Sequence, residues 1–104
     1  MPREVRFAIE AEQDLAAAEA WLAQPGAAVR AAARRQAIAT AIFALADWPC
    51  LWAPGVHDGT RERVVAGYTI VYEVDPDTGD NRTAGGVTVL RIFGPHQERV
   101  LERR

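Results

Sequence analysis

The periodicity of the hydrophobic residues changes along the chain, and this change constrains the fold more than any other feature of the sequence. Residues 4–9 alternate as in a half-buried strand, whose apolar members are Val5, Phe7 and Ile9. From Glu10 the spacing becomes helical, and the apolar face comprises Ala11, Leu15, Ala18 and Leu22. Pro25-Gly26 is expected to end this helix. We therefore predict a short strand followed directly by a helix.

A second helix is predicted from about residue 27 to residue 47. Its apolar stripe has the spacing i, i+3, i+4 and i+7 and consists of Ile38, Ala41, Ile42 and Leu45. Pro49 and Pro54 prevent the helix from continuing. Because the second helix is longer than the first and both are rich in alanine, we expect an antiparallel hairpin of closely packed helices.

Three further strands are predicted in the second half. Residues 61–66 and 68–74 read as a hairpin with its turn at Gly67, and residues 87–93 form the last strand after a loop. The element order is β-α-α-β-β-β. This order predicts an α+β fold, in which a helical hairpin packs on one face of a small, mainly antiparallel sheet, as a single domain over residues 1–104.

Composition narrows the class of protein further. The 104 residues are 49% hydrophobic and 25% charged, which is typical of one globular domain. No apolar run reaches the roughly 20 residues that span a bilayer, and the N-terminus lacks a signal-peptide pattern, so a cytoplasmic protein without a membrane role is expected. One cysteine and two histidines predict no disulfide, no metal site and no cofactor. The net charge of −2 argues against wholesale binding to nucleic acid, since only the second helix and the C-terminal end are basic.

Several short motifs, in this order, resemble the RelE/ParE superfamily of bacterial type II toxins. The resemblance covers nearly the whole chain and rests on Ala11-Glu12-Gln13-Asp14-Leu15, Leu45 with Pro49, Gly59-Thr60-Arg61-Glu62, Tyr68-x-Ile70-x-Tyr72 and Leu90-Arg91-Ile92. It implies a toxin that an antitoxin, usually encoded beside it, holds inactive in a hetero-oligomer. RelE-like members are ribosome-dependent mRNA endonucleases, whereas ParE-like members inhibit DNA gyrase and cleave no RNA.

Three arginines are the main candidates for a functional site. Arg61 and Arg63 lie two residues apart on one strand and point to the same side of the sheet, and Arg91 could converge with them from a neighbouring strand. Such a cluster suits phosphate or carboxylate ligands. The alternatives are pairing with Glu62, Glu73 or the antitoxin, or a solvated face.

Proton transfer would require a further group. No tyrosine follows Arg91, so His96 is the late candidate for a general acid or base in a nuclease that used Arg61, Arg63 and Arg91. In the ParE-like tail a His-Gly-Arg-Gln type of stretch is common, and Gly94 and His96 depart from it.

Tryptophans provide a second candidate surface. Trp21, Trp48 and Trp52 either close the edge of the core or form an antitoxin-binding surface, since tryptophan is a common interface anchor. The helical hairpin and a sheet edge are also expected to receive the antitoxin.

The favoured function is therefore a ParE-like toxin that inhibits gyrase by binding, limits growth and contributes to plasmid or chromosome maintenance, with a ParD-like antitoxin as partner. Its expected target-binding residues are Arg61, Arg63, Arg91, His96 and Arg99. The alternatives are a RelE-like mRNA endonuclease and an inactive homologue that serves as an antitoxin-binding module.

Overall fold

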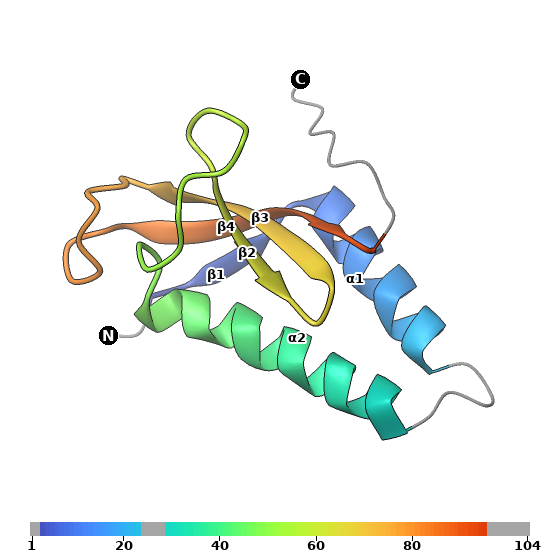
Figure 1. Ribbon diagram of the computed structural model, residues 1–104. Coiled ribbons are helices and arrows are strands. Elements are labelled where there is room, and N and C mark those ends of the chain that lie inside the picture. Colours follow the sequence, from blue (N-terminus) through green and yellow to red (C-terminus); the bar gives the residue numbers. More distant parts are fainter. Residues whose placement is uncertain (1–2, 24–28, 96–104) are drawn as a thin grey trace.

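A two-layer α+β domain is seen in the computed structural model, which describes residues 3–23 and 29–95, with the side chains of residues 29 and 30 undescribed. The elements follow the predicted order. They are β1 (Val5–Phe7), α1 (Ile9–Leu22), α2 (Val29–Asp47), β2 (Arg61–Val65), β3 (Tyr68–Asp75) and β4 (Gly86–Phe93) (Figure 1). The predicted fold class is confirmed.

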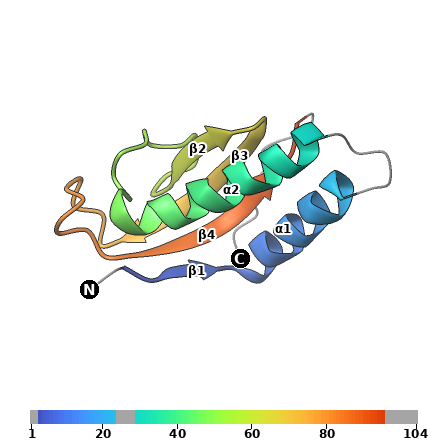
Figure 2. The ribbon, with the colours of Figure 1, turned by 90° about the horizontal axis from the view of Figure 1, so that it is seen from below.

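The four strands form one sheet in the order β1-β4-β3-β2. β1 runs parallel to β4, while β4, β3 and β2 pair antiparallel. Both helices cover one face of this sheet (Figure 2). A parallel β1–β4 pair is possible because the whole helical hairpin and β2–β3 lie between these strands in the chain.

The core lies between the helices and the sheet. All four residues of the predicted stripe on α2 are buried in it, as are Ala11, Ala18 and Leu22 of α1. The sheet contributes Ile70, Tyr72, Val74, Val87, Val89 and Ile92. The helical and strand periodicities of the sequence thus predicted the faces that meet in the core.

Ile9 is a correction to the predicted strand. It begins α1 instead of ending β1, and its side chain is exposed. The change occurs because the Ala8 N–H still bonds to the Val89 carbonyl of β4, while the Ala8 carbonyl already accepts the Glu12 N–H of α1. The predicted helix end at Pro25-Gly26 lies outside the described residues.

The β2–β3 hairpin turns through two residues, Ala66 and Gly67, which have φ values of 52° and 83°. Two consecutive positive φ values are typical of a type I′ turn, whose twist matches that of the flanking strands. Glycine adopts this conformation freely, whereas alanine is strained by its Cβ atom.

The substitution Ala66→Gly is therefore expected to raise the free energy of unfolding by about 0.5–1 kcal/mol. Chemical denaturation measures the change. As a control, Ala53→Gly in the linker, where φ is not positive, should lower stability by about 0.5 kcal/mol. An equal increase in the free energy of unfolding for Ala53→Gly and Ala66→Gly would contradict the assignment of strain to Ala66.

Candidate functional site

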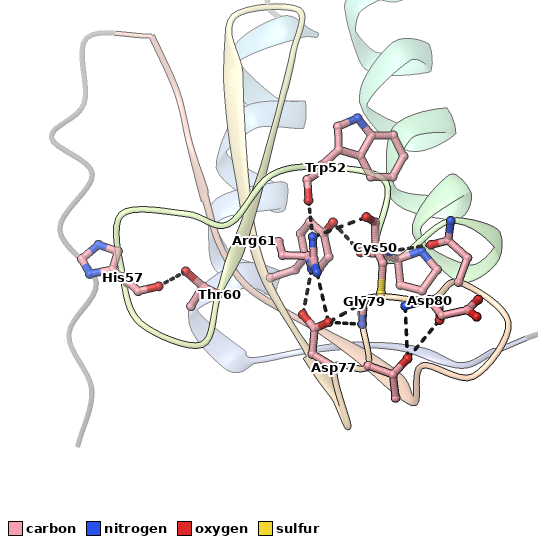
Figure 3. Close-up of polar contacts among 12 residues, drawn as sticks. Cys50, Trp52, His57, Thr60, Arg61, Asp77, Gly79 and Asp80 are labelled. Atoms are coloured by element: carbon pink, nitrogen blue, oxygen red, sulfur yellow. Dashed lines mark hydrogen bonds and ion pairs between the residues drawn. The ribbon is translucent and has the colours of Figure 1, made fainter.

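Arg61 lies at the start of β2 and ties together two segments that have no regular structure (Figure 3). Its Nε and Nη2 donate to both carboxylate oxygens of Asp77, at 2.8 and 3.0 Å. Its Nη1 donates to the Trp52 carbonyl at 2.6 Å. Only 14% of the Arg61 side chain is exposed. Arg61 thus holds the linker that follows α2 against the β3–β4 loop.

Two neighbouring groups stabilise the ionised form of the Asp77 carboxylate. The hydrogen bond from Arg61 holds the pKa of Asp77 below its usual value of 3.8, and the Gly79 N–H, which donates to the carboxylate at 3.0 Å, acts in the same direction. The bond to Asp77 likewise raises the pKa of Arg61. Both groups are therefore ionised across the physiological pH range.

Cys50 and Tyr72 flank this ion pair but lack the properties of reactive groups. Burial raises the pKa of the Cys50 thiol and the nearby Asp77 raises it further, whereas a nucleophilic cysteine needs a lowered pKa. The Tyr72 hydroxyl is buried and donates to the Pro49 carbonyl at 2.8 Å, and burial strongly raises its pKa. Tyr72 is thus a structural residue that fixes the start of the linker.

Arg63 lies on the same face of β2 as Arg61, because it pairs with Ile70 and Arg61 pairs with Tyr72. Its Nη1 donates to the Ala41 carbonyl of α2 at 3.1 Å, and its guanidinium lies 4.1 Å from the centre of the Trp52 ring. Within the described part of the chain, no carboxylate forms a salt bridge with Arg63. Partial desolvation lowers its pKa, but an arginine remains charged at any physiological pH.

Arg91 does not converge with the other two arginines. Its strand neighbour Ile92 shares the face of Arg63, so Arg91 points to the opposite side of the sheet, opposite Val71. At the edge of β4 beyond the end of β1, its Nε and Nη2 bind both carboxylate oxygens of Asp14 in α1, at 2.7 and 3.2 Å. The guanidinium also lies 4.7 Å from the centre of the Phe93 ring.

Asp14 has a second role in joining α1 to the sheet. One of its carboxylate oxygens accepts the Ile92 N–H at 2.9 Å, on the edge of β4 where β1 has already ended. The carboxylate therefore replaces a missing strand partner. Asp14 belongs to one of the motifs on which the family resemblance rests, but the spacing of that motif did not predict the contact of Asp14 with β4.

The other predicted site residues are scattered. His96 and Arg99 lie outside the described residues, so their roles stay predictions. Trp21 and Trp48 are exposed, near the C-terminal ends of α1 and α2, and Trp52 is partly buried beneath Arg63. Because α2 has 19 residues, about 28 Å in length, Trp21 and Trp48 lie at opposite ends of the hairpin.

An apolar groove lies between the two helices. Its volume is about 200 Å³, and Val5 and Phe7 of β1 form its floor. Its helical walls are Leu15, Ala18, Leu22, Ile38, Ala39 and Ile42, and its rim carries Glu19, Arg35 and the exposed Phe43. Among residues 3–23 and 29–95 no cluster of metal-ligating side chains occurs.

Comparison with solved structures identifies the class of fold. One chain in the crystal structure of the toxin–antitoxin complex RelBE2 from Mycobacterium tuberculosis is similar, with a TM-score of 0.57. The two sequences are 22% identical, and the match covers 90% of this chain and 99% of that chain. The fold is that of the RelE/ParE superfamily, as the sequence motifs predicted.

Comparison with protein families is more specific. The model of the family described as "ParE toxin of type II toxin-antitoxin system, parDE" matches residues 5–99. The chain therefore belongs to the ParE toxin family of type II toxin–antitoxin systems. No match was found among curated proteins.

The ion pair between Arg61 and Asp77 is expected to stabilise the fold in a pH-dependent way. Because the folded-state pKa of Asp77 is depressed, the ionised carboxylate contributes stability above its usual value of 3.8, and this contribution is lost as the pH falls through the lower, folded-state pKa. Asp77→Asn should lower the free energy of unfolding by about 1 kcal/mol at neutral pH, a value reduced for partial exposure of the carboxylate. The difference between the two proteins should shrink in acid.

Denaturant titrations at neutral and acidic pH measure this difference. Asp58→Asn, at an exposed position in the linker, serves as the matched control and should have little effect at either pH. An Asp77→Asn effect that was the same at both pH values would contradict the proposed charge interaction.

Proposed function

We propose that this toxin inhibits DNA gyrase by binding it and that a cognate ParD-like antitoxin neutralises it. The observation that supports binding over RNA cleavage is the placement of the arginines. Arg61 and Arg91 each form a bidentate ion pair with an aspartate, and the two arginines occupy positions on opposite faces of the sheet. They therefore do not form the shared phosphate site that a nuclease mechanism would need.

The two titratable groups beside the Arg61–Asp77 ion pair, Tyr72 and Cys50, offer no better support for proton transfer. The Tyr72 hydroxyl is buried and bonded to a carbonyl, and burial and the nearby Asp77 raise the pKa of the Cys50 thiol. General acid–base catalysis needs a group that reaches the reacting atoms with a pKa near the operating pH. Inhibition by binding needs no such group, so the arrangement of this domain fits it better.

Arg63 and Trp52 form the surface that we propose for the target. Arg63 has a charged group without a carboxylate partner in the described residues, and stacking on the Trp52 ring holds it in place. Arginine and tryptophan are the residue types that most often dominate interface energies. Arg61 supports this surface through its bond to the Trp52 carbonyl, whereas Arg91 has a structural role at the edge of β4, and His96 and Arg99 remain candidates for additional contacts.

A DNA supercoiling assay with purified gyrase and the chain alone tests the target. We expect loss of supercoiling or accumulation of cleaved DNA, and Arg63→Ala should weaken this inhibition by about tenfold. Arg82→Ala, at an exposed position in the β3–β4 loop, is the matched control and should inhibit normally. Unaffected gyrase would contradict the proposal and would direct the search to mRNA cleavage in translating extracts.

The groove between α1 and α2 is the surface that we propose for the antitoxin. Its lining is almost entirely apolar and its rim carries charges of both signs, which suits an amphipathic segment of a partner. The similar chain in the RelBE2 structure comes from a toxin–antitoxin complex, which supports a partner of this class. A cytoplasmic location, growth inhibition and a role in plasmid or chromosome maintenance follow from this proposal.

Ala39→Glu is expected to prevent capture by the antitoxin, because it places a charge in the wall of the groove. Copurification with the product of the adjacent reading frame measures capture. Ala33→Glu, at an exposed position on the same helix and outside the groove lining, should be captured normally. Normal capture of Ala39→Glu would place the antitoxin elsewhere.

A further inference from the structure

The outer edge of β1 is open for backbone pairing. β1 ends the sheet (Figure 2). On its inner side the Val87 N–H donates to the Glu4 carbonyl and the Ala8 N–H donates to the Val89 carbonyl. In a parallel pair with these bonds, the backbone groups of Val5 and Phe7 point outward. In the described part of the chain, no backbone group bonds to them there.

The opposite edge of the sheet is better protected. At β2 the linker after α2 lies along the strand, where Pro54 bridges to Arg61 and the Glu62 N–H donates to the Ala53 carbonyl. Unprotected edge strands are the usual sites for pairing with another chain. β1 is therefore the edge at which a strand of another molecule fits.

The side chains of β1 carry a self-complementary pattern. Glu4 and Arg6 point away from the helices, with 68% and 71% of their side chains exposed, and form an ion pair with each other at 3.1 Å. Val5 and Phe7 point toward the helices and line the groove. One face of the strand is thus charged with alternating sign, and the other face is apolar.

We propose that the free toxin forms a homodimer in which β1 pairs antiparallel with β1 of a second copy. An axis through Val5 brings Glu4 of one copy opposite Arg6 of the other, twice. An axis through Arg6 would instead bring two arginines together, and like charges directly opposite each other are destabilising. Charge complementarity therefore favours a second copy of β1 as the partner and favours the register centred on Val5.

The apolar groove supplies the rest of the interface. Pairing over residues 3–7 alone is too short for a stable dimer, because specific interfaces bury about 1,200–2,000 Å². The two-fold axis runs perpendicular to the sheet, so both helical layers lie on the same side and the two grooves become neighbours. Phe43, whose side chain is 76% exposed at the rim of the groove, is then placed to pack against the other copy.

Light scattering coupled to size-exclusion chromatography tests the dimer with the purified full chain, at concentrations from micromolar to submillimolar. We expect a mass twice that of the 11.4 kDa chain at the upper end of this range. Val5→Pro should yield a monomer, because it removes an outward N–H without removing a bond to β4. Circular dichroism checks that this variant is folded.

Charge reversal provides a second test that does not alter the backbone. Arg6→Glu should raise the dissociation constant of the dimer on the order of tenfold, because it places two carboxylates opposite each other. The double variant Glu4→Arg/Arg6→Glu should restore dimerisation. Arg82→Glu changes the net charge by the same amount at an exposed loop position and should have no effect.

Two results would overturn the proposal. One is a wild-type chain that remains a monomer over the whole range, which would leave the β1 edge to the antitoxin. The other is a dimer that persists in both Val5→Pro and Arg6→Glu, which would place the contact on another surface. Neither result bears on gyrase inhibition, because that assay does not depend on how the free toxin associates.

Discussion

The bond network of Arg61 holds together the part of the domain that has no regular structure. The linker after α2 and the β3–β4 loop each have backbone hydrogen bonds of their own, and Arg61 joins the two segments by donating to both. A largely buried guanidinium requires several acceptors, and a carboxylate together with a backbone carbonyl supplies them. The position of Trp52, and with it the stacked Arg63, depends on this network because Arg61 bonds to the Trp52 carbonyl.

A second arginine, Arg91, performs the same kind of task at the edge of β4. Asp14 binds Arg91 and the edge of β4 together, so the first helix is fastened where β1 ends. The partners of Arg61 and Arg91 lie 16 and 77 residues away in the chain. Because these partners are distant in the sequence, the sequence did not show that Arg61 and Arg91, both candidates for a phosphate site, have different structural roles.

Local features of the sequence predicted most of the fold. Periodicity placed both helices and the buried stripe of α2, and the turn at Gly67 placed the β2–β3 hairpin. Ile9 was assigned to the wrong element because its apolar side chain continued the alternation of β1, whereas backbone bonds already begin the helix there. The arrangement of the arginines was not predictable in the same way, because a one-residue bulge between β3 and β4 and two distant aspartates determine it.

The position of the proposed surfaces constrains how neutralisation can work. The groove and β1 lie at one edge of the sheet, and Arg63 with Trp52 lies at the other, because the strand order is β1-β4-β3-β2. A partner confined to the groove would leave Arg63 uncovered, because Arg63 is not part of the groove lining. An antitoxin that acts by covering the target surface must therefore extend from the groove across α2, whose Ala41 carbonyl already contacts Arg63. An antitoxin that stays within the groove would have to block the proposed target by its size alone, because the groove lining includes neither Arg63 nor Trp52.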